Sequence, residues 1–204
     1  MSGWPKILNE AAGVRGEFER ALASPEQQQT KLLLNTIHAN ADCEFGRICG
    51  FSDIETVEKF RTNVPVRDYE AFAPDIQRMF EGEQSILTSA DIIVFEETSG
   101  STSGPKLIPY THAGLNSFRN AVLPWLSDLA DCRPGVARGP SYWSISPAGR
   151  AARQSKAGVP VGLASDAAYF GNDLAPAVAE ISAVPPHLGA IGDIDTWRLE
   201  TLRH

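Results

Sequence analysis

Apolar residues recur at helical spacing through the first 90 residues of the chain. The clearest stripe predicts a helix that begins at Ser24-Pro25-Glu26-Gln27, because serine caps a helix, proline suits its first turn and Gln27 completes a capping box. The apolar positions of this helix are Leu33, Leu34, Ile37 and Ala41. Such a stripe is typical of a helix that packs one face into a core.

Two more helices are predicted before residue 90. Ser52-Asp53-Ile54-Glu55 repeats the capping box and starts a helix through about Phe60. Asp68 stands where it can cap the next helix, which ends just before Gly82. The apolar positions of that helix are Phe72, Ile76, Met79 and Phe80. We therefore predict a mainly helical N-terminal region over residues 1–90.

The pattern changes after Ala90. Asp91-Ile92-Ile93-Val94-Phe95 is a short, β-branched run that predicts a buried strand, and Tyr142-Trp143-Ser144-Ile145-Ser146 predicts another. A helix is expected between them, from about His112 to Ala130. Because strands alternate with helices, the sequence predicts an α/β portion over residues 91–204.

The last part of the chain predicts two helices. Asp173 stands where it can cap a helix through about Val184, which Pro185-Pro186 stops. Asp195 stands where it can cap another, which contains Trp197 and continues without a glycine or asparagine stop signal. Two interpretations follow: either the chain is truncated inside a helix and the α/β domain is incomplete, or a terminal helix docks on the core.

Composition and charge narrow the class of protein. The chain has 204 residues, of which 43% are hydrophobic and 21% charged, and these values argue against wholesale disorder. Its formal net charge of −7 argues against a nucleic-acid partner, because phosphate backbones bind clustered cations. No apolar run is long enough to span a membrane, and the N-terminus lacks a signal-peptide core, so no membrane partner is expected.

The cysteines and histidines give no sign of a metal site. Cys43 and Cys49 lack the C-x2-C spacing of a zinc site, and no further cysteine remains with which Cys132 could form a second pair. Buried structural thiols are the better interpretation, and they favour a reducing, cytoplasmic location. The histidines also lack metal-ligand spacing, and none is assigned a role: His38, His112, His187 and His204.

A stretch between Asp131 and Asp166 contains no acidic residue. Such a cationic stretch in an acidic protein either attracts an anionic substrate or is a solvated loop, which is the more common case. Its cations are Arg133, Arg138, Arg150, Arg153 and Lys156.

The most informative segment runs from Glu96 to Lys106 and contains a loop of small residues. It follows a predicted buried strand, and its glycines Gly100 and Gly104 permit the close approach of a ligand. Its successive N–H groups, its hydroxyls and the Lys106 cation suit the oxygens of a polyphosphate. A flexible Ser/Gly linker has a similar composition, but linkers rarely lie directly between a buried strand and a helix. We therefore predict a phosphate-binding loop.

Other motifs with a similar composition do not match this loop. The Walker pattern fails because only three residues separate Gly100 from Gly104 and Pro105 precedes Lys106, and the nucleophile elbow fails because Thr102 holds its central position. Ser103-Gly104-Pro105-Lys106 satisfies the S-x-x-K motif of serine–lysine acyl transfer. Gly-Pro opposes the helical turn that this motif needs, and its companion motifs are absent, so a serine hydrolase is disfavoured.

The residues in and around this loop resemble a known family. Thr98–Lys106 is similar to the Ser/Thr/Gly phosphate loop of adenylate-forming enzymes, the superfamily of acyl-CoA synthetases and luciferase. From about residue 30 to its end, the chain resembles the bacterial branch of the Gretchen Hagen auxin-responsive family of acyl-acid amido synthetases. The flanking blocks that carry this resemblance are Leu107-Ile108-Pro109-Tyr110-Thr111, Val64-Pro65-Val66-Arg67-Asp68-Tyr69-Glu70, Asp75-Ile76-Gln77-Arg78, Gly82-Glu83, Ile86-Leu87-Thr88, Tyr142-Trp143-Ser144-Ile145-Ser146-Pro147 and Gly158-Val159-Pro160-Val161-Gly162-Leu163-Ala164-Ser165-Asp166.

The resemblance implies a fold, a reaction and a set of ligands. The α/β portion would be part of an adenylate-forming domain. ATP and a carboxylic acid would give an acyl-adenylate and pyrophosphate, and an amino acid's amine would then form the amide and release AMP. The implied cofactors are ATP and Mg²⁺, and the implied partners are a small carboxylic acid, an amino acid and the missing C-terminal portion of the enzyme. No metal ligand is identified in this chain.

The resemblance also implies site residues. Lys106 would close the loop around the ATP phosphates, although Ser103 stands where the superfamily usually has glycine. Arg119 falls near an arginine that similar enzymes use toward the carboxylate of the acyl substrate, and an exposed helical arginine without that role is the alternative. No catalytic residue is assigned. The loop residues that would hold the phosphates are Ser99, Gly100, Ser101, Thr102, Ser103 and Gly104.

The length of the chain leaves two hypotheses of different classes. Members of this family are considerably longer, and their other nucleotide motifs would lie beyond His204. In the first hypothesis, these residues are the N-terminal part of an ATP-dependent ligase and are active only as part of the whole enzyme. In the second, they are a non-catalytic remnant or a nucleotide-binding module without ligase activity.

Overall fold

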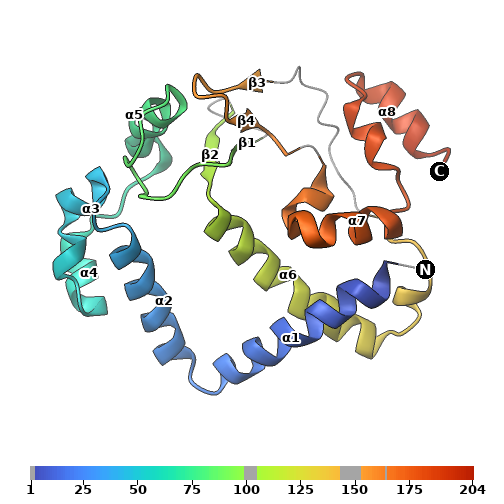
Figure 1. The fold of residues 1–204 in the computed structure, drawn as a ribbon, viewed down its shortest axis with the longest axis horizontal. Helices are drawn as coiled ribbons and strands as arrows, with labels where there is room; N and C mark the ends of the chain where they lie inside the picture. The colour runs from blue at the N-terminus through green and yellow to red at the C-terminus, as the bar shows by residue number, and fades with distance from the viewer. Residues whose placement is uncertain (1–2, 99–104, 143–152, 164) are drawn as a thin grey trace. The chain divides into compact units, whose positions relative to one another are not determined.

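The structure is a computed structural model that describes residues 3–98, 105–142, 153–163 and 165–204 (Figure 1). The tip of the predicted phosphate loop, most of the strand predicted at Tyr142-Trp143-Ser144-Ile145-Ser146, and Arg150 lie outside these residues. The chain forms two compact units, each made of separated segments. Unit 1 contains Met1–Arg20, His112–Arg153 and Gly162–His204, and unit 2 contains Ala21–Thr111 and Gln154–Val161.

Unit 2 contains short helices and the two strands that flank the predicted phosphate loop. Its helical elements are α2 (Pro25–Ala39), α3 (Glu44–Cys49), the 3-10 turn η1 (Phe51–Asp53), α4 (Val57–Asn63) and α5 (Tyr69–Phe80). The sheet contains β1 (Val94–Glu97), β2 (Leu107–Tyr110), β3 (Arg153–Gln154) and β4 (Pro160–Val161), in the order β2-β1-β4-β3. Because β1 pairs antiparallel with β2 and parallel with β4, the sheet is mixed.

Two apolar clusters hold unit 2 together. In the first, Ile37 of α2 packs with Cys49, Phe51 and Ile54, all of them buried. In the second, α5 covers the central strand β1, and Phe95 is fully buried. Pro109 lies on β2, which is an edge strand, where the missing N–H of proline removes no ladder hydrogen bond.

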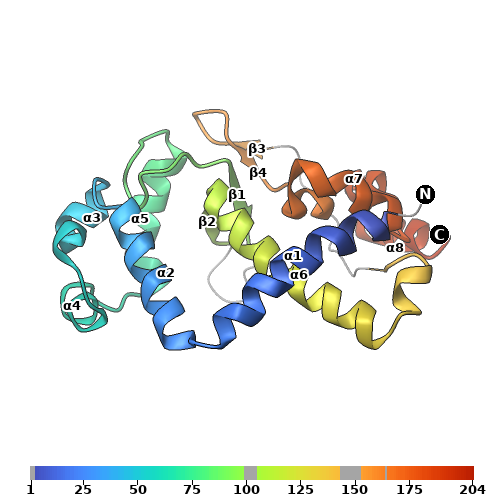
Figure 2. The same ribbon diagram turned by 60° about the horizontal axis from the view of Figure 1, so that its bottom comes forward.

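Unit 1 is built around two long helices. α1 (Trp4–Leu22) lies beside the second half of α6 (His112–Cys132) in both views (Figure 1 and Figure 2), and Arg15 of α1 forms ion pairs with Asp128 and Asp131 of α6. The remaining elements of unit 1 are η2 (Val136–Arg138), η3 (Asp166–Phe170), α7 (Gly171–Ile181), η4 (Pro186–Ala190) and α8 (Ile194–Thr201).

The core of unit 1 lies where α1, α6 and α7 meet. Trp4 and Ile7 of α1, Leu123 of α6 and Leu174 of α7 are almost completely buried in one cluster. The Trp4 indole also donates a hydrogen bond of 2.8 Å to the carbonyl of Gly139. Within the described residues, no helix is both long and apolar enough to cross a membrane.

The predicted fold class is confirmed: the chain is helix-rich with a small mixed sheet. Three predicted helices occur nearly as expected, namely α2, α5 and α6, and α6 continues through Pro124. Residue 90 separates two kinds of secondary structure in the sequence, and its use as a domain boundary stays a prediction.

Three helix starts were predicted at the wrong residues. The segment at Ser52 forms only the turn η1, because Phe51 and Ile54 are buried on either side of it, and α4 starts later with Thr56 as its cap. α7 starts at Gly171, which places Asp173 inside its first turn. The cap of α8 is Asp193, whose carboxylate accepts a hydrogen bond from the Thr196 amide at 2.8 Å.

The first predicted strand and one cysteine also need correction. β1 begins at Val94 rather than Asp91, since its ladder with β2 begins at the pair of Val94 and Tyr110. Cys132 is exposed rather than buried. Cys43 and Cys49 are buried as predicted, and the Cys43 sulfur accepts the Gly46 amide as the cap of α3.

Candidate functional site

The predicted phosphate loop lies between two antiparallel strands. β1 and β2 pair from Val94 opposite Tyr110 to Glu97 opposite Leu107, so the loop connects the strands of a β-hairpin. The sequence predicted a strand followed directly by a helix; β2 intervenes before α6, and that expectation is corrected. Ser99, Gly100, Ser101, Thr102, Ser103 and Gly104 themselves lie outside the described residues.

The base of the loop is closed by two hydrogen bonds. The Thr98 amide donates to the Lys106 carbonyl at 2.9 Å, and the Lys106 amide donates to the Thr98 hydroxyl at 3.1 Å. These bonds extend the ladder of β1 and β2 by one residue pair. They fix the two ends of the loop, and therefore the backbone of Lys106, relative to the sheet.

The first turn of α5 holds the side chain of Lys106. The Lys106 ammonium lies 3.1 Å from a carboxylate oxygen of Glu70 and 4.8 Å from the centre of the Tyr69 ring. These are the distances of an ion pair and of a cation–π contact. Lys106 is half-buried, and Glu70 is the more exposed partner.

Tyr69 also connects α5 to the strand that follows the loop. Its hydroxyl accepts a hydrogen bond from the Leu107 amide (2.9 Å) and donates one to the Leu107 carbonyl (3.1 Å). Because Tyr69 is the first residue of α5, the cap at Asp68 places it: the Asp68 carboxylate accepts the Ala71 amide at 3.0 Å. The sequence alone assigned neither Tyr69 nor Glu70 a role, because Tyr69 precedes Leu107 by 38 residues.

Arg67, just before this cap, contacts aromatic rings of two helices. Its guanidinium lies 5.3 Å from the ring centre of Phe45 in α3 and 5.8 Å from that of Phe72 in α5. The two rings pack edge to face, 5.7 Å apart. This cation–π stack connects the helix that holds Lys106 to α3.

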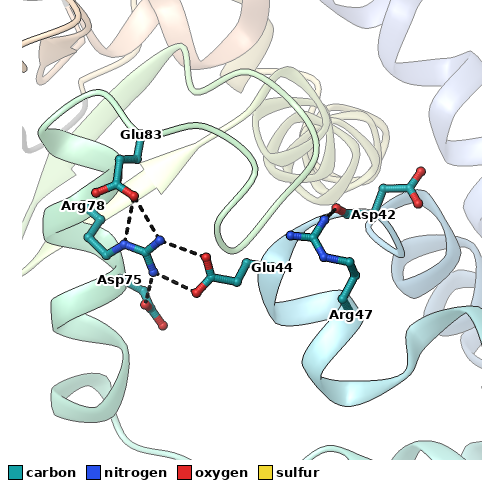
Figure 3. A network of polar contacts seen from close by, with 6 residues as sticks. All are labelled: Asp42, Glu44, Arg47, Asp75, Arg78 and Glu83. Atoms are coloured by element: carbon teal, nitrogen blue, oxygen red, sulfur yellow. Dashed lines mark hydrogen bonds and ion pairs between the residues drawn. The ribbon is translucent and has the colours of Figure 1, made fainter.

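The far end of α5 carries a network of ion pairs around Arg78 (Figure 3). The guanidinium of Arg78 donates to both carboxylate oxygens of Glu44, at 2.9 and 2.8 Å, and also contacts Glu83 and Asp75. These hydrogen bonds lower the pKa of the Glu44 carboxyl and raise the pKa of the Arg78 guanidinium. The network ties α5 to α3 and therefore supports the position of α5 against the hairpin.

Arg119, the candidate for the acyl carboxylate, lies in unit 1. Its guanidinium binds both carboxylate oxygens of Asp173 at 2.9 Å and one oxygen of Glu10 at 2.8 Å. Its side chain is only 15% exposed, and it lowers the pKa of the Asp173 carboxyl. The residue therefore has the geometry that recognises carboxylates, with two carboxylates of this chain as its present partners.

The remaining candidates do not form a site in the described part of the chain. No group of three or more histidine, cysteine, aspartate or glutamate side chains there is arranged to hold a metal ion. Of the cationic stretch, Lys156 pairs with Glu81 and lowers the pKa of that carboxyl, and Arg133 donates to the Cys132 carbonyl. The Nε2 atom of His38 donates a hydrogen bond of 2.8 Å to the carbonyl of Ile54.

Solved structures share this fold, among them two of acyl acid amido synthetases. A structure described as the GH3.15 acyl acid amido synthetase superposes on this chain with a TM-score of 0.72 and 20% sequence identity. The superposition covers 92% of this chain and 33% of that protein. A structure of the AtGH3.15 acyl acid amido synthetase in complex with 2,4-DB superposes on 67% of the chain, and on 24% of its own, with a TM-score of 0.59 and 26% identity. The fold is that of part of an acyl acid amido synthetase.

The chain belongs to the GH3 family, because the model of the GH3 family N-terminal domain matches its residues 14–193. The probable indole-3-acetic acid-amido synthetase GH3.1 of Arabidopsis thaliana is 36% identical over 112 residues, which are 52% of this chain and 18% of that protein. The indole-3-acetic acid-amido synthetase GH3.4 of the same plant is 31% identical over 133 residues, 63% of this chain and 22% of that protein. The chain spans about a fifth of the length of these relatives.

Proposed function

We propose that these residues are the N-terminal part of an ATP-dependent acyl-acid amido synthetase. The family membership and the names of the relatives support the reaction class. In this reaction a carboxylate oxygen attacks the α-phosphorus of ATP and pyrophosphate leaves. The amine of an amino acid then attacks the acyl carbon, which forms the amide and releases AMP.

The observation that carries the proposal is the position of Lys106 at the base of the hairpin loop. The Lys106 carbonyl accepts the Thr98 amide and the Lys106 amide donates to the Thr98 hydroxyl, and these two hydrogen bonds fix its main chain. Its ammonium lies beside Glu70 of α5. The loop from Ser99 to Gly104 would hold the ATP phosphates through its N–H groups and hydroxyls, with Lys106 supplying a cation. Mg²⁺ would come with the ATP, since the described residues offer no cluster of ligands for it.

The Lys106 ion pair does not prevent this role. Both partners are partly exposed, and an exposed ion pair contributes at most ~1 kcal/mol. Charge-assisted hydrogen bonds to a phosphate are stronger, about 1.5–3 kcal/mol each. A phosphate can therefore replace Glu70 as the partner of the ammonium.

Arg119 is our candidate for the carboxylate of the acyl acid. Of its two present partners, Glu10 makes a single contact and Asp173 a bidentate one, so a substrate carboxylate would replace Glu10 more easily. A role in substrate binding requires that Arg119→Gln raise the KM for the acid. A purely structural role would instead lower the free energy of unfolding without changing the KM.

The proposal is tested by ATP–pyrophosphate exchange in the presence of a panel of carboxylic acids. With these residues joined to a segment that corresponds to the rest of the relatives' length, we expect exchange that depends on the acid. In that protein Lys106→Ala should lose about tenfold to a hundredfold, because a charged hydrogen bond to phosphate is removed. Lys59→Ala is the matched control, since it removes a lysine from α4 of the same unit. Equal exchange in Lys106→Ala and the wild type would contradict the proposal.

The alternative to a ligase is a nucleotide-binding module or remnant without ligase activity. The chain covers only about a fifth of the relatives' length, and catalysis needs groups that surround the transition state together. In the ligase hypothesis, these residues act together with a segment that corresponds to the rest of the relatives' length. ATP binding without any exchange, under conditions where a longer family member exchanges, would favour the alternative.

A further inference from the structure

The side chain of Lys106 makes contacts that no role in the family reaction requires. Glu70 and Tyr69 both come from the first turn of α5, and both contact the Lys106 ammonium. A lysine at the end of a phosphate loop could extend into solvent, because an ammonium on four methylenes is strongly hydrated. Here it lies over an aromatic ring, with a carboxylate as its counter-ion.

The same two residues are themselves fixed by the fold. Tyr69 makes both of its hydroxyl hydrogen bonds to Leu107, the residue directly after Lys106. Glu70 lies in the first turn of a capped helix, whose amide dipoles favour a negative charge. The lysine, its ring and its counter-ion are therefore placed by one helix start and one strand.

We propose that Tyr69 and Glu70 are positioning residues that hold Lys106 at the base of the loop in the absence of nucleotide, and that phosphate binding releases Lys106 from Glu70. The release of Lys106 by phosphate rests on the proposed function, whereas the contact that holds Lys106 does not. Glu70 competes with the phosphate for the ammonium, and so sets how tightly ATP binds. The Tyr69 ring keeps the ammonium at the loop while its partner changes from a carboxylate to a phosphate.

The holding contact is measured by NMR without any ligand. The chain has five lysines, so lysine labelled with carbon-13 at the ε position gives five resolved signals that substitution can assign. In the wild type the Lys106 ε-methylene protons should lie upfield of the other four, because the face of the Tyr69 ring shields them. Glu70→Gln should reduce this upfield displacement, and Tyr69→Leu should abolish it.

Glu58→Gln is the matched control for Glu70→Gln. Glu58 is an exposed acidic residue in the first turn of α4 in the same unit, so its substitution removes the same charge from an equivalent helix position. It should leave the Lys106 signal unchanged. An unchanged signal in Glu70→Gln, or a wild-type signal at the position of the other lysines, would overturn the holding contact.

Release is measured by adding ATP. ATP should move the wild-type Lys106 signal, and Glu70→Gln should bind ATP about twofold to fivefold more tightly, as loss of an exposed competing ion pair predicts. Glu58→Gln should bind ATP like the wild type. Equal affinities of Glu70→Gln and the wild type would overturn the competition. If ATP moves no signal in any variant, the proposed function and the release fail together, whereas the holding contact is judged on the ligand-free spectra.

Discussion

Gly171, at the start of α7, has a backbone conformation that glycine adopts far more easily than other residues. Its φ is +81° and its ψ 162°, a region that costs a residue with a side chain about 1–3 kcal/mol. A Cβ at this position would also lie 3.0 Å from a carboxylate oxygen of Asp173 and 3.3 Å from Arg119. The glycine therefore permits the chain to bring Asp173 to the guanidinium.

We expect Gly171→Ala to lower the free energy of unfolding by about 1–3 kcal/mol, as measured by urea denaturation. Gly13→Ala is the matched control, because Gly13 lies inside α1 with open space around it. That substitution should stabilise the protein by ~0.5–1 kcal/mol through helix propensity. Equal effects of the two substitutions would show that the conformation of Gly171 does not constrain the fold.

The Arg78 network predicts a dependence of stability on pH. Because Arg78 lowers the pKa of Glu44 below its usual value of 4.5, this carboxylate stabilises the fold above that pH. The contribution is lost as the pH falls through the lower pKa of the folded state, because the carboxyl then becomes protonated. The network thus contributes most near neutral pH.

We expect Arg78→Gln to lower the urea midpoint at about pH 7, and the difference from the wild type to shrink at about pH 3.5. Arg61→Gln is the control, since Arg61 lies in the last turn of α4 of the same unit. Its effect should be small and similar at both pH values. A difference between Arg78→Gln and the wild type that does not change with pH would contradict the assigned role of Glu44.

At the scale of elements, α5 is the helix that connects the loop to the rest of unit 2. Its start holds Lys106 through Tyr69 and Glu70, and its end binds α3 through Arg78. One face packs on β1 through the cluster that contains Ile76. The position of the candidate site therefore depends on where this helix begins.

We expect Asp68→Ala to destabilise the protein by about 0.5–2 kcal/mol, because the substitution removes the hydrogen bond to the Ala71 amide. Ser24→Ala at the start of α2 is the control: Ser24 makes no capping hydrogen bond, so its effect should stay below ~0.5 kcal/mol. The free energy of unfolding from urea titrations measures both. A larger effect at Ser24 than at Asp68 would contradict this difference between the two caps.

At the scale of the whole molecule, the buried apolar residues form separate clusters within each unit. Leu174 belongs to the cluster of unit 1, and Ile54 to a cluster of unit 2. Both side chains are almost completely buried. Each unit therefore has a core made from its own segments, although α1 begins in unit 1 and ends in unit 2.

We expect Leu174→Ala and Ile54→Ala each to lower the free energy of unfolding by about 2–5 kcal/mol. Hydrogen exchange followed by mass spectrometry should locate the loss of protection in the unit that carries the substitution. Each variant serves as the control for the other. A uniform loss of protection over both units, in either variant, would show that they unfold as one.

The sequence by itself predicted the features that depend on local chemistry and spacing. The stripes of α2, α5 and α6, the cap at Asp68, the helix-rich α/β class and the family are all encoded within short segments. Where local signals compete, they failed: a capping box at Ser52 and carboxylates at Asp173 and Asp195 each look like helix starts. Phe51 and Ile54 are buried on either side of Ser52, the Asp173 carboxylate pairs with Arg119, and Asp193 rather than Asp195 caps α8.

Only the tertiary structure decided what surrounds the candidate site. The sequence predicted Lys106 as the cation of a phosphate loop, but its partners Tyr69 and Glu70 come from a helix much earlier in the chain. Contacts over such separations depend on how α5 packs on the hairpin, and no local pattern specifies that packing. The sequence therefore determined which residues carry the chemistry, and packing determined which residues hold them in place.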